Sequence, residues 1–203
     1  MIVVLTAVSG RPQLPGTKMV FVVFLAAFSI FIIWRARILE IALEQPTNVN
    51  IAAPDFWAAT PNGGSVSLAE FRGQKKVVVS FWASWCLPCR VELSALNTFY
   101  EKYHTASSDF EILAISVDLD TREAMNFATR QKLSFPVLLD PGERVAKEYE
   151  QKGLPTTFII DKNGNITYGH VGYDDRFIPQ LAHELGLTLK QSTESGTDGR
   201  AGH

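Results

Sequence analysis

The chain has 203 residues, 46% of them hydrophobic and 20% charged, which is enough for one ordinary domain with a real core plus an additional segment. Its formal net charge of -2 gives no general attraction to nucleic acid or to anionic lipid. Two cysteines are too few for a disulfide-stapled scaffold or a four-thiolate zinc site, and the four histidines lack ligand spacing, so we expect no metal.

The first feature along the chain is an uncharged apolar run, residues 19–34. As a helix it would span roughly 24 Å, slightly less than a ~30 Å hydrocarbon core, and the flanking Lys18 and Arg35 can extend to the interfaces. Its apolar character on every face argues against a buried core helix. No small-x-small site follows it, which argues against a cleaved signal peptide. We therefore expect one uncleaved transmembrane anchor.

The segments around this run complete the expected domain organisation. Residues 1–18 contain no folding pattern, residues 35–52 form a linker, residues 53–187 a folded domain, and residues 188–203 a disordered tail rich in Ser, Thr and Gly. Basic residues on the two sides of the apolar run nearly balance, so charge leaves the membrane orientation open. A start at Met19 instead of Met1 would shift that balance toward a cytoplasmic domain.

Apolar runs and turn signals divide the folded domain into alternating strands and helices. We expect strands over residues 77–82, 111–117, 137–139 and 156–161, and helices over residues 90–102, 121–132, 144–152 and 177–187. Ser67 and Glu70 predict a capped helix start, residues 61–64 a turn between two extended pieces, and residues 162–165 a hairpin turn. This alternation predicts an α/β fold, in which helices cover both faces of a mixed, mostly parallel sheet with an antiparallel hairpin at one edge.

Both cysteines, Cys86 and Cys89, lie between an expected strand and an expected helix. A Cys-x-x-Cys at such a junction is typical of a dithiol/disulfide redox centre. A free thiol of pKa ~8.5 is only about 3% ionised at pH 7, and a helix N-terminus favours its anion. Cys86 is therefore the expected nucleophile, and Cys89, one turn inside the helix, resolves the mixed disulfide. Leu87 and Pro88 add no charge, so the dipeptide does not separate an oxidant from a reductant.

Three further residues near this centre each allow two interpretations. Glu92 can raise the thiol pKa values or relay a proton, or it can be an exposed helix glutamate near the positive N-terminus. Ser80, in an apolar run, is more typical of a satisfied core hydroxyl than of a catalytic group. Pro155 precedes a strand, and an arbitrary X-Pro bond is normally trans.

Residues 81–89 (FWASWCLPC) and 153–158 (GLPTTF) resemble the thioredoxin superfamily. The likeness is greatest to the membrane-anchored, extracytoplasmic thiol-disulfide oxidoreductases of the TlpA/ResA type. It extends to the domain opening at residues 53–56, to Arg90-x-Glu92, and to an inserted strand-helix unit at residues 111–140. The resemblance covers about residues 53 to 187 and implies a thioredoxin-like fold with an N-terminal β-hairpin.

The resemblance also implies roles for individual residues. Pro155 corresponds to a cis-proline that faces the dithiol, and Glu92 to an active-site glutamate. The implied substrate contacts are Trp85, Leu87, Pro88, Leu154, Pro155 and Thr156. Ser80 stands where thioredoxins carry a buried acid, which strengthens Glu92 as the proton carrier. Ser94 stands where many relatives carry a proline that kinks the helix.

The function implied is that of a membrane-tethered thiol-disulfide oxidoreductase on the extracytoplasmic, periplasmic side. It would reduce protein disulfides, with apocytochrome c as a candidate substrate, and would receive electrons from a transmembrane thiol carrier. Its redox group is the Cys86–Cys89 disulfide, with no further cofactor.

Two other functions remain open. The Ala-Pro-Asp-Phe opening also occurs in peroxiredoxin-like peroxidases, although Ala83-Ser84-Trp85 does not supply the threonine that normally positions a peroxide. The third possibility is a tethered binding module with a structural disulfide. The expected exposure of Cys86 argues against it.

Overall fold

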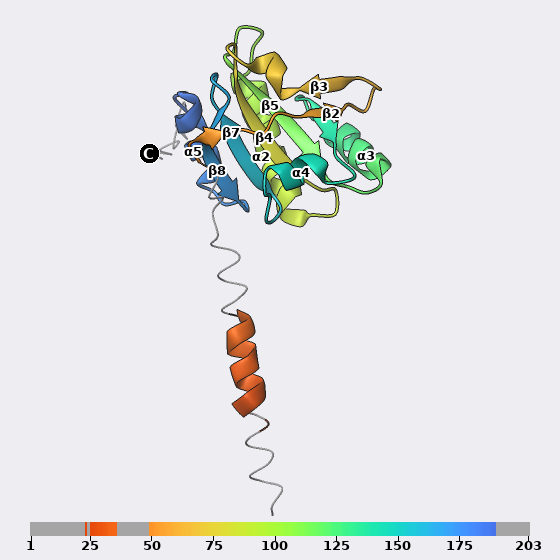
Figure 1. Ribbon diagram of the computed structural model, residues 1–203, viewed down its shortest axis with the longest axis vertical. Helices are drawn as coiled ribbons and strands as arrows, with labels where there is room; N and C mark the ends of the chain where they lie inside the picture. Colours follow the sequence, from red (N-terminus) through yellow and green to blue (C-terminus); the bar gives the residue numbers. More distant parts are fainter. Residues whose placement is uncertain (1–22, 24, 36–48, 190–203) are drawn as a thin grey trace, which may run out of the picture. The chain divides into compact units, whose positions relative to one another are not determined.

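The computed structural model describes residues 23, 25–35 and 49–189 (Figure 1). Residues 25–35 are helical. No helix within the described residues combines the length and apolar character needed to cross a membrane. The predicted anchor includes residues 19–22 and 24, which lie outside the described residues, as do residues 1–18, 36–48 and 190–203. The anchor therefore stays a prediction.

Residues 49–189 contain one sheet of eight strands. The strands are β1 (Ile51–Ala52), β2 (Trp57–Ala59), β3 (Ser65–Ser67), β4 (Lys76–Trp82), β5 (Phe110–Ser116), β6 (Val137–Leu139), β7 (Thr156–Ile160) and β8 (Asn165–Val171). Their order is β1-β8-β7-β4-β5-β6-β2-β3. The pairs β4–β5 and β5–β6 are parallel. The other five pairs are antiparallel, so the sheet is mixed as expected, but the expectation of a mostly parallel sheet is wrong.

The lengths of two helices explain this difference. Helix α3 (Thr121–Gln131) has 11 residues, about 16 Å, and carries the chain back so that β6 lies parallel to β5. Helix α4 (Arg144–Glu148) has only 5 residues, about 7 Å, which is too short to retrace a strand of about 16 Å. The chain therefore starts β7 from the edge where β6 ended, and β7 runs antiparallel to β4.

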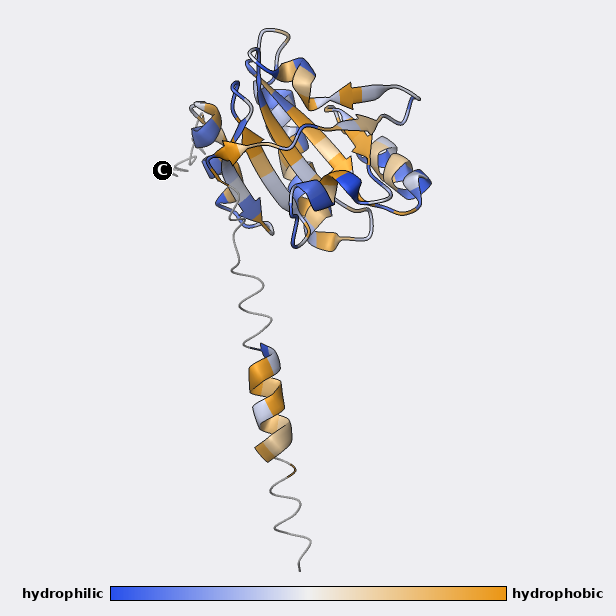
Figure 2. Cartoon of the chain, in the orientation of Figure 1, coloured by the Kyte–Doolittle hydropathy of each residue, from blue (hydrophilic) through white to orange (hydrophobic). Residues whose placement is uncertain are grey.

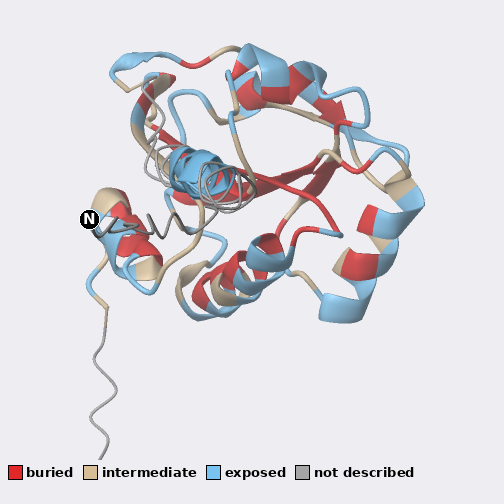
Figure 3. Ribbon diagram, turned by 90° about the horizontal axis from the view of Figure 1, so that it is seen from below, coloured by how far each residue is buried: buried red, intermediate tan, exposed pale blue. Residues whose placement is uncertain are grey.

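The remaining helices complete a three-layer arrangement. They are η1 (Leu68–Phe71), α2 (Leu87–Tyr103) and α5 (Phe177–Leu185). Helices α2, α3 and α5 share one core cluster with the sheet, whereas α4 and η1 share the other. Figure 3 shows the buried strands between helices whose inner faces are also buried. The hydrophobic strands in the middle of the domain are visible in Figure 2.

Strand β4 contributes side chains to both core clusters, because successive side chains point to opposite faces of the sheet. Val78 and Trp82 join the cluster beneath α2, whereas Val77, Val79 and Phe81 join the cluster beneath α4. By this alternation Ser80 faces α2, in a strand whose residues from Val77 onward are all buried. The continuous apolar run therefore reflects a central strand that is covered on both sides.

One local prediction is confirmed and two are corrected. Ser67 and Glu70 form the expected capping box at η1. Helix α4 ends at Glu148 instead of 152, because Glu150 adopts a left-handed backbone with φ of 50°. Residues 51–52, assigned from the sequence to the linker, form β1 and pair with β8.

Candidate active site

The cysteines form a disulfide at the amino end of α2. Cys86 and Cys89 are bonded, and Cys86 is the N-cap of the helix. The Cys86 Sγ accepts a hydrogen bond from the Cys89 backbone N–H at 3.3 Å. Pro88 lies in the first helical turn, where no intrahelical donor is needed. A thiolate on Cys86 would thus accept the Cys89 N–H and lie at the positive end of the helix dipole.

The disulfide lies in a groove, and its neighbours carry most of the exposed surface. Cys86 is 5% exposed and Cys89 is fully buried, so the expectation of an openly exposed Cys86 is wrong for the oxidised form. Trp85 and Leu87, on either side of Cys86, are 66% and 70% exposed. The groove has a volume of about 540 Å³, and its lining residues are Trp85, Cys86, Leu87, Pro88, Gln151, Lys152, Gly153 and Leu154.

The loop that faces the disulfide contains the one cis peptide bond among the described residues, Leu154–Pro155, which confirms the cis-proline. Pro155 is buried, and its carbonyl accepts from the Gly172 N–H at 2.8 Å. Thr156 is also buried, and its hydroxyl donates to the Gly153 carbonyl at 2.5 Å. Of this segment, Gly153 and Leu154 line the groove.

Glu92 is buried beneath the dithiol, three residues after Cys89 on the same helix. It is 1% exposed, which excludes the interpretation as a surface glutamate. Its Oε1 accepts hydrogen bonds from the Ser80 and Thr157 hydroxyls, each at 2.8 Å. These two residues are direct partners across β4 and β7, so both hydroxyls point toward α2. The Glu92 Oε2 has no hydrogen-bond partner in the described part of the chain.

Burial raises the pKa of Glu92 from 4.5 to about 7. The cause is desolvation of the charged form, which outweighs the two hydroxyl donors that favour it. A carboxyl group with this pKa can take up or release a proton near neutral pH, one helical turn from Cys89. Ser80 is a buried hydroxyl with its hydrogen bond satisfied, as expected, and its partner is the Glu92 carboxyl group.

Thr157 was not among the site residues predicted from the sequence. It follows Pro155 by two residues and therefore sits in a strand that looks purely structural. What identifies Thr157 as a site residue is the antiparallel pairing of β7 with β4 in the structure, which places Thr157 opposite Ser80. A sequence pattern that predicts a parallel sheet cannot give this pairing.

Helix α2 is one continuous α-helix from Leu87 to Tyr103. Ser94, in the position where many relatives carry proline, is exposed, and its carbonyl accepts from the Thr98 hydroxyl at 3.0 Å. Continuous helical geometry places Glu92 and Cys89 on one face.

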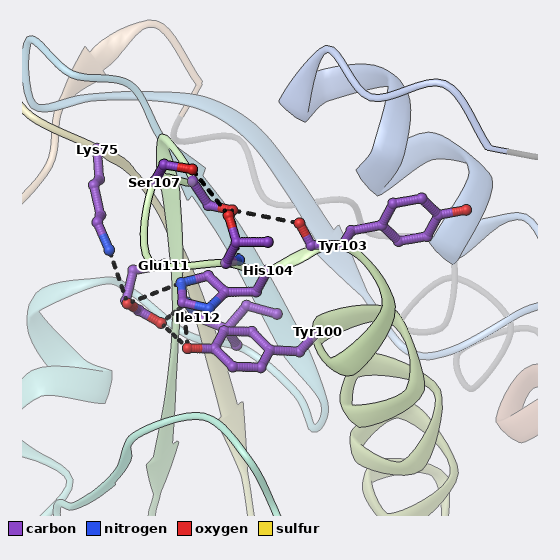
Figure 4. A network of polar contacts seen from close by, with 9 residues as sticks. Lys75, Tyr100, Tyr103, His104, Ser107, Glu111 and Ile112 are labelled. Carbon is purple, nitrogen blue, oxygen red and sulfur yellow. Dashed lines mark hydrogen bonds and ion pairs between the residues drawn. The ribbon is translucent and has the colours of Figure 1, made fainter.

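A second buried glutamate, Glu111, lies at the start of β5 (Figure 4). The Glu111 Oε1 accepts from the Tyr100 hydroxyl at 2.8 Å. Its Oε2 lies 3.3 Å from the Lys75 Nζ and 3.4 Å from the His104 Nε2. The His104 ring also stacks on Tyr100 at 4.1 Å. Both carboxylate oxygens of Glu111 are thus paired, in contrast to Glu92.

Comparisons with known proteins agree with this geometry. Residues 49–169 match the family model described as AhpC/TSA family. The chain is 35% identical to the thiol-disulfide oxidoreductase ResA of Bacillus thuringiensis subsp. konkukian over 123 residues, which cover 61% of this chain and 69% of the relative. It is 35% identical to the thioredoxin-like protein YneN of Bacillus subtilis over 154 residues, covering 68% and 89% respectively.

Among solved structures, the chain is similar to a thiol:disulfide interchange protein of the thioredoxin family from Chlorobium tepidum. The two have a TM-score of 0.58 and 30% sequence identity, and the match covers 68% of this chain and 97% of the other. The Cys86–Cys89 disulfide, the cis-proline and the mixed sheet are therefore parts of a thioredoxin-like domain. The chain belongs to the AhpC/TSA family and is a thioredoxin-like thiol-disulfide oxidoreductase of the ResA/TlpA type.

Proposed function

We propose that the chain reduces disulfides of protein substrates outside the cytoplasm, with Cys86 as the nucleophile, Cys89 as the resolving thiol and Glu92 as the proton carrier. The observation that carries this proposal is the state of Glu92. It is a fully buried carboxyl group with one oxygen held by two hydroxyls, the other oxygen unpartnered, and a pKa of about 7.

The first step uses Cys86. In the reduced protein its thiolate attacks one sulfur of the substrate disulfide. A mixed disulfide forms, and the first substrate thiolate leaves and takes a proton from water. The helix N-terminus and the Cys89 N–H favour the Cys86 anion, so this step does not require a nearby base.

The second step uses Cys89 and Glu92. The buried Cys89 thiol transfers its proton to the Glu92 carboxylate and attacks the Cys86 sulfur. The mixed disulfide breaks and the second substrate thiolate leaves, so two electrons have passed from the dithiol to the substrate. The products are a reduced substrate, the Cys86–Cys89 disulfide and protonated Glu92. The free Oε2 is the atom available for that proton, because Oε1 already accepts two hydrogen bonds.

Location and partners form a further part of this proposal. The uncharged run at residues 19–34 and the resemblance to the TlpA/ResA oxidoreductases support a single N-terminal anchor, with the domain on the periplasmic side. The same resemblance supports apocytochrome c as a substrate and a transmembrane thiol carrier as the electron donor. Of the predicted contacts, Trp85, Leu87, Pro88 and Leu154 line the groove where a substrate would enter.

The test uses the reduced 203-residue chain and insulin as a disulfide substrate. Wild-type chain should reduce insulin, the Cys89→Ser variant should accumulate a mixed disulfide with it, and the Cys86→Ser variant should do neither. Hydrogen peroxide is the comparison oxidant. Rapid oxidation by peroxide together with no reaction with insulin would replace this proposal with a peroxidase.

A further inference from the structure

In the loop just before the disulfide, the backbone N–H, the hydroxyl and the carbonyl of Ser84 all form hydrogen bonds. Its backbone N–H donates to the Asp118 carboxylate at 2.8 Å and 3.0 Å. Its hydroxyl donates to the same carboxylate at 2.8 Å. Its carbonyl accepts from the Arg90 Nε at 2.6 Å. Ser84 lies two residues before Cys86, so these bonds fix the position of the backbone just before the nucleophile.

Asp118, the partner of Ser84, is itself held in place. It is 2% exposed, and its carboxylate also accepts from the Ser116 hydroxyl at 2.8 Å. A buried carboxylate whose two oxygens each accept more than one hydrogen bond is held in one orientation. On the other side of Ser84, the Arg90 guanidinium packs 5.6 Å from the centre of the Phe127 ring on α3.

These bonds join two loops that leave the sheet side by side. Strands β4 and β5 are parallel neighbours, and Trp82 pairs with Ser116 at their ends. The Val117 N–H then donates to the Trp82 carbonyl at 2.9 Å. The Ser84–Asp118 bonds continue this pairing past the sheet edge, so the loop before the disulfide and the loop after β5 form one unit.

Each loop presents one large apolar side chain directly after its anchored residue. Trp85 follows Ser84 and is 66% exposed, and Leu119 follows Asp118 and is 88% exposed. Leu119 is the most exposed large hydrophobic residue in the described part of the chain. Because Leu119 stays in water, it adds no hydrophobic burial to the fold, and covering it on binding would be favourable.

We propose that Trp85 and Leu119 form one apolar contact surface for the substrate polypeptide beside its reacting cysteine, and that Asp118 is the positioning residue that holds the surface together. This inference rests on the proposed function and extends it to a residue outside the groove. The mixed disulfide explains why the substrate polypeptide would occupy this surface. A substrate cysteine bonded to Cys86 brings its own chain across the adjacent Trp85, and an apolar residue next to that cysteine then reaches Leu119.

The experiment measures insulin reduction by the 203-residue chain, with glutathione disulfide as a small, polar second oxidant. Leu119→Ser should raise KM for insulin about three- to tenfold, the range expected when one apolar side chain is no longer covered on binding. The ratio of insulin turnover to glutathione disulfide turnover should fall by the same factor. Ile51→Ser is the matched control: it removes an exposed apolar side chain from β1 at a far edge of the sheet, and both rates should match wild type.

Asp118→Asn tests the positioning role, since an amide cannot accept all the hydrogen bonds that the carboxylate accepts. It should raise KM for insulin as Leu119→Ser does, and the double variant should be little worse than either single variant, because both act on one surface. Ser84→Ala, which removes the hydroxyl contacts to Asp118 and Glu123 but keeps the backbone bonds, should give a smaller rise in the same direction. It replaces Asp118→Asn if that variant does not fold.

Three outcomes would overturn the inference. A wild-type KM for insulin in Leu119→Ser would show that Leu119 does not contact the substrate. Equal losses with insulin and glutathione disulfide in Asp118→Asn would make Asp118 purely structural. If the effects of Asp118→Asn and Leu119→Ser on KM were fully additive in the double variant, the two residues would act independently. A wild-type chain that reduces neither oxidant would instead refute the proposed function itself.

Discussion

The two buried glutamates of this domain, Glu92 and Glu111, have the same side chain and opposite surroundings. Glu111 meets the Lys75 ammonium, the His104 imidazole and the Tyr100 hydroxyl, so each of its oxygens has a partner. Glu92 meets two hydroxyls at one oxygen and no cation. A buried carboxylate is stable as an anion only where charge or donors replace water.

The contrast shows which of the two can serve in proton transfer. The network around Glu111 joins α2, the start of β5 and the segment before β4, so this side chain contributes to the structure (Figure 4). Glu92 lies beneath the disulfide with a pKa of about 7. Burial without a cation therefore turns an ordinary acid into a group that exchanges protons near neutral pH.

The sharpest way to break the comparison is to make the same substitution at both sites and measure activity. Glu92→Gln should lower the rate of mixed-disulfide resolution about a hundredfold or more, because it removes the acceptor for the Cys89 proton. Glu111→Gln should leave this rate within about twofold, since it lies outside the site. Stopped-flow insulin reduction under single-turnover conditions measures both, and equal rates for the two variants would contradict the distinction.

Stability against pH sharpens the same contrast. The folded protein holds the Glu92 proton more tightly than the unfolded chain, with a pKa of about 7 against 4.5. The contribution of Glu92 to wild-type stability should therefore fall by about 3 kcal/mol as pH rises from about 4.5 to above 7, since each unit is about 1.4 kcal/mol. Glu92→Gln removes this loss and should be more stable than wild type by about that amount near pH 8, and equally stable near pH 4.

Urea unfolding of the oxidised chain at both pH values measures this difference. A Glu92→Gln variant that is less stable than wild type near pH 8 would show that the carboxylate is satisfied in the fold.

At the other site the sign should reverse. Glu111→Gln loses the charge that faces Lys75 and weakens the bond to Tyr100, so it should destabilise the fold by about 1–3 kcal/mol near neutral pH. The ionic part of this loss should shrink at high salt only slightly, because Glu111 is 8% exposed. The same urea titration reports it, and a stabilising Glu111→Gln would remove the contrast between the two glutamates.

The smallest expected effect concerns the hydroxyls that hold Glu92. Thr157→Val keeps the side-chain shape but removes one donor that lowers the Glu92 pKa. That pKa should rise further, by about one unit or ~1.4 kcal/mol, and the pH profile of insulin reduction should shift upward with it. Thr98→Val, at an exposed position on α2, is the control. A pH profile for Thr157→Val that coincides with that of the control would exclude Thr157 from the site.

The residues of the dithiol could be predicted from the sequence because their chemistry depends on local order. Cys86, Cys89 and Pro88 need only a strand, a turn and a helix start, and each of these has a short-range signal. The cis bond at Pro155 and the role of Glu92 came from the resemblance, since spacing alone left both open.

The surroundings of Glu92 and Ser84 could not be predicted in this way because they depend on pairing between distant strands. Thr157 reaches Glu92 only because β7 runs antiparallel beside β4, whereas the alternation of strands and helices predicted a mostly parallel sheet. Asp118 reaches Ser84 across 34 positions in the chain. Such contacts follow from sheet topology, which short apolar runs do not encode.

The measurement that tests the central claim most directly is the titration of the Glu92 carboxyl itself. The oxidised 203-residue chain, labelled with carbon-13 at the glutamate carboxyl carbons, is titrated by NMR, and the Glu92→Gln variant identifies the resonance. A midpoint near pH 7 is the predicted result. A midpoint near the ordinary value of 4.5 would mean that Glu92 is a permanent anion at neutral pH, and the proposed proton transfer from Cys89 would fall.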